Sequence, residues 1–377
     1  MKHPYLTDDH EQFRKAFRKF LEKEAYPNYE KWERAHIIPR EFWLKLGENG
    51  FLCPDLPEEY GGSGTDWGYS VVINEELEKV GSGTVGINLH NDIVVPYGTE
   101  EQKQRYLPKC ASGEIITAIA MTEPGAGSDL AGISTTAILH DDHYIVNGQK
   151  TFITNGIHAD LVLVACKTNP SAVPKHKGIS LLLIEKETDG FSKGKHLNKV
   201  GLHSQDTAEL IFDECRVPKE NLLGEEGCGF QYMMDKLQQE RLVVALAAQV
   251  AAEEMLELTL DYIKSRTAFG KPIGSFQNTQ FKMAEMATDI EMGRAFLEQL
   301  IAEHIAGEDV VTKVSMAKWK LTEMARNVAV QCMQLHGGYG YMEEYKIARR
   351  YRDIPVASIY AGTNEIMKVI IAKRLGL

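Results

Sequence analysis

The amino-acid sequence predicts a mainly α-helical protein with a central β domain. Its pattern is helical up to about residue 115, rich in short apolar β-type runs from there to about 220, and helical again from about 226. This order does not suit a doubly wound parallel sheet, in which strands and helices alternate. A chain of 377 residues is long enough for two or three domains. We expect three, at residues 1–117, 118–224 and 225–377.

The N-terminal part carries signals for the starts of helices. Asp8 with Glu11, and Thr99 with Gln102, have the spacing of a capping box, in which two side chains bind each other's backbone N–H groups. Pro39 is suited to the beginning of another helix, because a proline there costs no hydrogen bond. The region up to residue 117 is therefore predicted to be an α-helical domain.

The middle part reads as strands. The runs LVLVACK (161–167) and ISLLLIE (179–185) are short, apolar and β-rich. The stretch YIVNGQKTFITNG alternates on both sides of Asn147-Gly148, a dipeptide that is the strongest short-range signal for a hairpin turn. We expect a hairpin at this position.

The C-terminal part reads as long helices. Residues 310–335 keep a helical period and end at Gly337 and Gly338, a natural place for a helix to stop. Thr363 is placed to cap a terminal helix.

Composition excludes several classes of protein. A net charge of −11 argues against nucleic acid as the main partner. No apolar run approaches the roughly 20 residues that cross a membrane, and the first twenty residues are too charged for a signal peptide. The six cysteines are scattered without a CxxC pair, which indicates reduced thiols and no metal site. We expect a cytoplasmic protein that is not a membrane protein.

One carboxylate falls on an apolar helix face. Glu240, in QQERLVVALAAQ, has only apolar residues beside it at helical spacing, and an ionised group there loses hydration at a cost of several kcal/mol unless it is paired. Glu240 is either an exposed or ion-paired helix residue or a functional group. The apolar neighbours are Met233, Leu237, Val244, Ala247 and Ala251.

A glycine-rich stretch, MTEPGAGSDL (121–130), allows two interpretations. It is not a dinucleotide fingerprint, because Gly125 and Gly127 lack a third glycine and strands follow. It is either a surface turn or a segment that brings backbone N–H groups and the hydroxyls of Thr122 and Ser128 close to a flat polar ligand.

Two further stretches are ambiguous in the same way. RTAFGKPIGSFQ (266–277) holds an arginine suited to phosphate and an aromatic ring suited to adenine, yet it also reads as a plain helix connection. QLHGGYGYMEEY (334–345) offers glycines that allow close approach of a backbone, or a simple helix end, and its His336 is expected to be a structural hydrogen-bonding group.

Together and in this order, the motifs closely resemble the acyl-CoA dehydrogenase family. The resemblance covers essentially the whole chain: MTEPGAGSDL, NGQKTFITNG, the Arg-x-x-Phe-Gly loop with FQ, QLHGGYGY and the terminal Tyr-x-Gly-Thr. It implies an N-terminal helical domain, a β-barrel-like middle domain and a C-terminal four-helix bundle. It also implies an FAD enzyme that forms a homotetramer, built as a dimer of dimers.

The resemblance further assigns site residues. FAD would lie between the β domain and the C-terminal bundle, with its pyrophosphate and adenine end held across a subunit interface. The implied cofactor-binding residues are Met121, Thr122, Gly127, Ser128, Phe152, Ile153, Thr154, Arg266, Phe269, Gln277, Gln334, Gly337, Gly338, Thr363 and Glu365. The implied substrate-binding residues are Ser128, Gln238, Arg241, Ala361 and Gly362.

The chain departs from the common pattern at Ala361. Many family members carry the catalytic glutamate there, so either this protein is inactive or its base stands elsewhere. Glu240 resembles the base of a minority branch, the long-chain and isovaleryl enzymes, which carry it on the first long C-terminal helix in a Glu-Arg-Leu context. By this resemblance Glu240 abstracts the α-proton of a fatty or branched-chain acyl-CoA.

The implied reaction belongs to fatty acid β-oxidation. The β-hydrogen passes as hydride to flavin N5, and the product is a trans-2-enoyl-CoA. Developing enolate charge needs hydrogen-bond donors, which the resemblance supplies as the backbone N–H of Ala361 and the FAD ribityl hydroxyl. The electrons go to an electron-transferring flavoprotein.

Two alternatives remain open at this stage. One is an acyl-CoA oxidase or flavin monooxygenase with the same fold, which the lack of extra terminal domains disfavours. The other is a paralogue that kept the fold for assembly or binding, which Glu240 disfavours. The sequence does not fix the acyl chain, and either long straight or branched chains are compatible with it.

Overall fold

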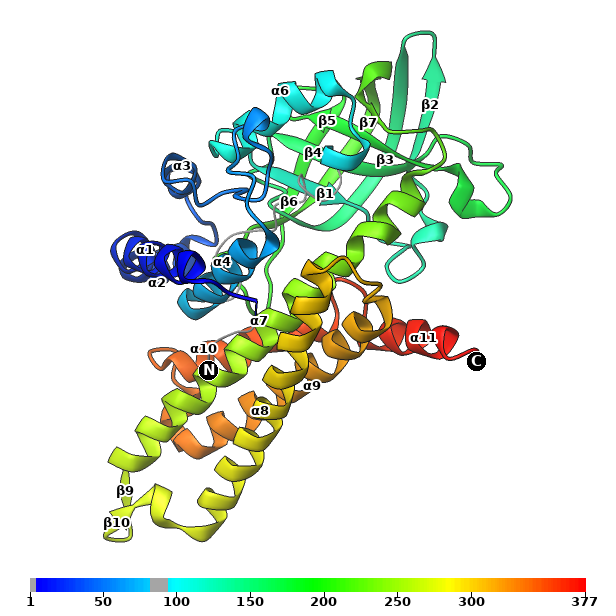
Figure 1. Cartoon of the computed structure of the whole chain (residues 1–377). Coiled ribbons are helices and arrows are strands. Elements are labelled where there is room, and N and C mark those ends of the chain that lie inside the picture. The colour runs from blue at the N-terminus through cyan, green and yellow to red at the C-terminus, as the bar shows by residue number, and fades with distance from the viewer. Residues whose placement is uncertain (1–4, 82–93) are drawn as a thin grey trace.

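A computed structural model describes residues 5–81 and 94–377, and it confirms the α, β, α order. Figure 1 shows N-terminal helices on one side, a sheet domain above, and long C-terminal helices below. Residues 1–4, which begin the charged N-terminal segment, and residues 82–93 of the predicted N-terminal domain lie outside the described residues.

The N-terminal domain buries aromatic and aliphatic side chains between its helices. Phe17 and Leu21 of the first helix are fully buried, and Phe17 packs against Phe51 with ring centroids 4.7 Å apart. The described helices are α1 (Asp8–Glu24), α2 (Tyr29–Ala35), α3 (Arg40–Glu48), α4 (Trp67–Val80) and α6 (Glu100–Ala111).

Of the two predicted capping boxes, one is confirmed and one is wrong. Thr99 and Gln102 cap α6 reciprocally, as expected. At α1 the box is formed by Thr7 and His10 instead of Asp8 and Glu11. The ring of His10 accepts a hydrogen bond from the backbone N–H of Thr7 and is fixed from its other side by Asp66, 3.0 Å away. A tertiary contact therefore selects the box.

Pro39 directly precedes α3 as its N-cap, so the helix begins where the sequence indicated.

The middle domain is an eight-stranded mixed sheet. Seven strands follow the order β6-β7-β3-β2-β4-β5-β8, and β1 pairs in parallel with β4. The predicted runs 161–167 and 179–185 are confirmed as strands β4 and β5, which pair antiparallel. The strands are β1 (Thr117–Ala120), β2 (Thr136–His140), β3 (His143–Thr154), β4 (Leu161–Lys167), β5 (Ile179–Glu185), β6 (Phe191–His196), β7 (Thr207–Pro218) and β8 (Leu222–Leu223).

The hairpin predicted at Asn147-Gly148 is wrong. These residues lie inside the twelve-residue strand β3, at a register shift in its pairing with β7. The glycine is needed for close approach, since a Cβ on Gly148 would lie 2.4 Å from the Thr135 hydroxyl. The real turn lies at Asp141, whose φ of 52° allows β2 to reverse into β3. Asn-Gly therefore marks a β-bulge here and not a turn.

Three long helices dominate the C-terminal domain. The longest, α7, runs from the sheet domain to a small hairpin at the far end of the molecule (Figure 1). The helix predicted at 310–335 is confirmed as α9, which ends at Gly337 with φ 60°. In the described part of the chain, no helix is both long and apolar enough to cross a bilayer. The elements are α7 (Gly229–Ser265), β9 (Thr267–Ala268), β10 (Lys271–Pro272), α8 (Gln277–Ile305), α9 (Val311–His336), α10 (Lys346–Asp353) and α11 (Asn364–Arg374).

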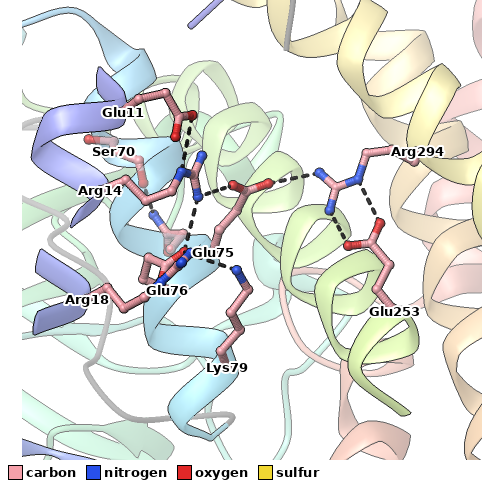
Figure 2. Close-up of polar contacts among 10 residues, drawn as sticks. Glu11, Arg14, Arg18, Ser70, Glu75, Glu76, Lys79, Glu253 and Arg294 are labelled. Carbon is pink, nitrogen blue, oxygen red and sulfur yellow. Dashed lines mark hydrogen bonds and ion pairs between the residues drawn. The ribbon is translucent and has the colours of Figure 1, made fainter. Parts of the chain in front are cut away.

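Buried ion pairs join the N-terminal helices to the C-terminal ones. Glu75 of α4 accepts hydrogen bonds from Arg14 of α1 and Arg294 of α8, each at 2.8 Å (Figure 2). Arg294 also binds Glu253 of α7 through two hydrogen bonds of 2.7 Å. Four helices are thus tied by one chain of paired charges, which we call the α4 network.

Candidate active site

Glu240 is buried and has no recorded partner in the described part of the chain. It lies on α7 with 7% of its surface exposed, and among the described residues no hydrogen-bond donor is recorded for its carboxylate. Burial raises its pKa to about 7, although the neighbouring Arg241 charge acts in the opposite direction. An exposed or ion-paired surface residue, the plainer of the two expectations, is therefore excluded. A buried carboxyl group with a pKa near neutrality is typical of a functional site.

The side chain of Arg241 contacts a strained turn. Its Nε donates to the carbonyl oxygen of Ala361 at 3.3 Å, and the guanidinium is itself almost completely buried. Ala361 and Gly362 both have left-handed backbone conformations, with φ values of 52° and 87°. Arg241, the residue next to Glu240 on α7, thus connects this helix to the turn. Nearby on α7, the Gln238 side-chain oxygen is buried without a partner among the described residues.

A buried lysine holds the same turn from the other side. Lys318 of α9 is 0% exposed and donates to the carbonyl oxygen of Gly362 at 2.7 Å and to the Asn364 side chain at 3.2 Å. Asn364 in turn exchanges a hydrogen bond with Thr322. Thr363 caps α11 by accepting from the N–H of Ile366, as predicted.

The glycine-rich segment 121–128 is fixed to the middle of β3. The buried Lys150 donates to the carbonyl of Met121 at 3.1 Å and to Glu123 at 2.8 Å. The N–H of Thr151 donates to the carbonyl of Thr122 at 2.9 Å. These bonds place Met121 and Thr122 beside Phe152, which is consistent with the expectation that all three residues contact one ligand.

Phe152 is turned outward by a second irregularity in β3. The pairing with β7 shifts register between Lys150 and Ile153, and Phe152 adopts φ 59° with 69% of its surface exposed. Ile153 is buried beneath it, and Thr154 is half-buried. A large apolar ring in a left-handed conformation gains nothing from such exposure within this chain, so a ligand or a partner is expected to cover it.

The remaining predicted cofactor residues form a separate group at the far end of α7. Arg266 stacks on the Tyr339 ring, with its guanidinium 5.5 Å from the ring centroid, and Phe269 is 95% exposed. Twenty-five helical residues separate Arg241 from Arg266, which at 1.5 Å per residue is roughly 38 Å. One chain therefore does not bring the two groups onto one ligand. The other members of this group are Gln277, which is the first residue of α8, Gln334, Gly337 and Gly338.

The sequence interpretation missed Lys318 and the pair Lys150–Glu123. Lys318 carries the same signal as Glu240, because it is a charge on an apolar helix face, between Val314 and Leu321. The signal of Lys150 is weaker, since a strand that alternates presents many polar residues. His336 is structural, as expected: its ring bonds the Cys332 carbonyl and stacks on Tyr262.

The residues present fit an FAD. A Cβ added at Gly125, Gly127, Gly337 or Gly338 would meet no atom within 4 Å, so packing within the chain does not explain these glycines and they leave open space. Exposed aromatic rings border both groups, at Phe152 and Phe269. Hydroxyls and backbone N–H groups at 122–128 and an exposed Arg266 provide donors for a polar ring system and for a pyrophosphate.

This fold and this arrangement define a flavin-dependent acyl-CoA dehydrogenase. Family models of the acyl-CoA dehydrogenase N-terminal, middle and C-terminal domains match residues 7–114, 118–215 and 227–376 of this chain, respectively. The chain belongs to the acyl-CoA dehydrogenase family and is an oxidoreductase that uses FAD.

Individual relatives agree with this assignment. The crystal structure of an acyl-CoA dehydrogenase from Geobacillus kaustophilus is 68% identical, covers 100% of both chains and superposes with a TM-score of 0.98. The mitochondrial long-chain specific acyl-CoA dehydrogenase of Rattus norvegicus is 46% identical over 98% of this chain and 87% of its own length. A glutaryl-CoA dehydrogenase from Mycobacterium smegmatis in complex with FADH2 is 30% identical, with a TM-score of 0.90 over 98% and 95% of the chains.

Proposed function

We propose that the protein catalyses α,β-dehydrogenation of a fatty or branched-chain acyl-CoA to a trans-2-enoyl-CoA, with Glu240 as the base that removes the α-proton. The observation that carries this proposal is the buried carboxylate of Glu240, which has no hydrogen-bond donor among the described residues. At the position where many relatives place the base, this chain has Ala361, whose side chain cannot take a proton.

The environment of Glu240 suits the chemistry. The α-proton of a thioester is only weakly acidic, so a base with the ordinary glutamate pKa of about 4.3 would be weak. The apolar surroundings raise the pKa of Glu240 to about 7, which strengthens the base while leaving a large fraction ionised at neutral pH. Arg241 keeps the pKa from rising further.

The reaction also requires stabilisation of the negative charge that forms on the substrate, and the turn at Ala361 and Gly362 can provide it. Among the described residues, no acceptor is recorded for the backbone N–H groups of Ala361, Gly362 and Thr363. Backbone donors on a turn that is in contact with Arg241, the neighbour of Glu240, suit the thioester oxygen, where charge develops when the α-proton leaves. We assign this role to the N–H of Ala361, and contact with the acyl-CoA to Ser128, Gln238 and Gly362.

FAD, when bound, supplies the acceptor for the hydride. Its flavin end is assigned to the segment 121–128 with Phe152, Ile153 and Thr154, and to Thr363 and Glu365. The distance between the two groups of candidate residues supports a shared site, in which Arg266, Phe269 and Gln277 serve the cofactor of a neighbouring subunit. A homotetramer, an electron-transferring flavoprotein as acceptor, a cytoplasmic location and the three domain boundaries stay predictions.

Exchange of Glu240 for glutamine tests the assignment of the base. Glu240→Gln keeps shape and polarity, so we expect FAD content and acyl-CoA binding to stay near those of the parent while flavin reduction slows by about 10²–10⁴-fold. The measurement is stopped-flow reduction across acyl-CoA substrates from isovaleryl to palmitoyl. Glu257→Gln, an exposed carboxylate on the same helix, is the matched control. Flavin reduction at the parent's rate in Glu240→Gln would show that the base stands elsewhere.

A further inference from the structure

Two buried cations meet at the turn without a carboxylate of their own. Two other fully buried cations are paired with carboxylates: Arg350 binds Glu78 at 2.5 Å, and Lys150 binds Glu123 at 2.8 Å. At the turn, both acceptors recorded for Lys318 are neutral oxygens, and the acceptor recorded for Arg241 is the neutral carbonyl of Ala361. Desolvating charges against neutral groups alone is costly. The arrangement therefore calls for a reason other than stability.

The turn itself is strained. Ala361 has a side chain, yet its φ of 52° lies in the left-handed region, where the Cβ atom is brought too close to the following carbonyl oxygen. Such a conformation persists only where its surroundings over-determine it. Here the carbonyl oxygen of Ala361 is held by Arg241 from α7, and the next carbonyl oxygen, of Gly362, is held by Lys318 from α9.

Because peptide groups are planar, these two contacts also fix the directions of the neighbouring backbone N–H groups. In a trans peptide, the N–H of one residue points away from the carbonyl of the residue before it. Fixing the oxygens of Ala361 and Gly362 toward the cations therefore points the N–H groups of Gly362 and Thr363 to the other side. Like the N–H of Ala361, these two N–H groups have no acceptor recorded among the described residues.

We propose that Arg241 and Lys318 are positioning residues, a two-cation clamp that fixes the turn 361–363 through its successive carbonyl oxygens and adds a positive field behind its N–H groups. This inference rests on the proposed function, because the clamp fixes the conformation of the turn that begins at Ala361, whose N–H is assigned to the thioester oxygen that gains charge as Glu240 removes the proton. Neither cation touches the substrate in this role.

The clamp makes activity sensitive to alkaline pH. Burial and the nearby charge of Arg241 lower the pKa of Lys318 to about 8, and Glu365 of α11 opposes them weakly. The other groups that contact the ammonium, Asn364 and the Gly362 carbonyl, do not titrate. Loss of the Lys318 proton leaves a neutral amine behind the turn. We expect turnover to rise through pH 7 as Glu240 ionises and to fall again above about pH 8.

Lys318 is the better position for a test, because replacing Arg241 would also change the pKa of Glu240. Lys318→Met removes charge and donor, whereas Lys318→Gln keeps an N–H donor without the charge. Lys346→Met is the control for removing a lysine that donates to a backbone carbonyl, at 2.7 Å: Lys346 is partly buried, binds the carbonyl of Lys79 on α4 and, unlike Lys318, also pairs with Glu254. All variants are assayed as FAD-loaded protein, with melting temperature and FAD content recorded.

We expect Lys318→Met to lower kcat roughly 10- to 100-fold with little change in KM, which corresponds to the loss of one hydrogen bond from a charged group. Lys318→Gln, which keeps a donor but lacks the charge, should recover only part of this loss, to about the level at which the parent works above pH 8, and the alkaline limb should be absent from both variants. A second readout does not depend on turnover. The apparent pKa of bound acetoacetyl-CoA, read from its enolate absorbance, should rise by about one unit in Lys318→Met.

The outcomes separate the two proposals. If Lys318→Met matches Lys346→Met in kcat and in enolate formation while Glu240→Gln is inactive, the clamp is wrong and the base assignment stands. The clamp is also overturned if the alkaline limb persists in both Lys318 variants, or if Lys318→Gln is as slow as Lys318→Met. If instead Glu240→Gln stays active, the proposed function fails first.

Discussion

Two regions of this protein bury glutamates on helices and treat them in opposite ways. In the α4 network, Glu76 is 1% exposed, and burial alone would raise its pKa, but hydrogen bonds and charges from Arg18 and Lys79 lower it to about 2. On α7, Glu240 is buried to a similar degree, has no such partners, and has its pKa raised to about 7. Burial is common to both, so the partners decide the direction.

The difference separates architecture from chemistry. Glu75 connects helices of two domains through its ion pairs (Figure 2), and Glu76 beside it, with its pKa lowered to about 2, stays ionised throughout the physiological range. A carboxylate left without donors can exchange a proton near pH 7, which a catalytic base needs. Arginines are available in this fold, and the site of Glu240 holds only Arg241, whose Nε is directed to the turn.

The largest expected effect comes from breaking the α4 network. Glu75→Gln removes the charge that Arg14 and Arg294 share, while Glu76 and Glu253 still pair with these arginines, so we expect a loss of about 3 kcal/mol in the free energy of unfolding, from two weakened hydrogen bonds to charged groups. Urea denaturation at pH 8 measures it. The fraction that stays folded should keep the parent's turnover. Equal losses in Glu75→Gln and Glu240→Gln would erase the distinction between the two regions.

The pH dependence of stability should have opposite signs in the two regions. Glu240 binds its proton more tightly when folded, so its contribution is fully present below about pH 4.5 and is lost as the pH rises to about 7. Glu76 contributes stability above about pH 4.5 that is lost as the pH falls toward 2. Glu240→Gln should therefore stabilise the protein at pH 8, by roughly 3 kcal/mol at most.

Unfolding curves of Glu240→Gln and Glu76→Gln, compared with those of the parent between pH 3 and pH 8, check this expectation. A Glu240→Gln curve parallel to that of the parent between pH 4.5 and pH 7 would mean that the carboxyl group is solvated or paired in the folded protein.

A smaller effect is expected from moving the carboxylate. Ala361→Glu in a Glu240→Gly background places an acid where many relatives have their base, and we expect turnover to recover about tenfold over Glu240→Gly alone, with a preference for shorter acyl chains. The new carboxylate would lie beside the clamp formed by Arg241 and Lys318, so its pKa should be lower than that of Glu240 and its activity should extend to lower pH. Pre-steady-state flavin reduction from pH 5 to pH 9 measures both.

Patterns of neighbouring residues predicted the helices and strands better than they predicted the turns and caps that depend on distant residues. The strands 161–167 and 179–185, the helix ending near Gly337 and the cap at Thr363 follow from periodicity and from cap chemistry, which depend on neighbouring residues. The turn predicted at Asn147-Gly148 was wrong because a close contact with Thr135, the residue just before β2, made the glycine necessary inside β3. His10 replaced Glu11 in the first cap because Asp66, far along the chain, fixes the imidazole.

The sequence by itself determined that Glu240 lies on the apolar face of a long helix and that Ala361 cannot be a base. Only the tertiary structure decided that this carboxylate is buried with no partner among residues 5–81 and 94–377. Glu78 is also a glutamate on a mostly apolar helix, yet it is paired by Arg350, which is 272 positions away in the chain. Ion pairs are made by side chains that folding brings within about 4 Å of each other, and no local pattern records which distant cation arrives. For the same reason, no local pattern predicted that Arg241 and Lys318 would bind the carbonyl oxygens of Ala361 and Gly362.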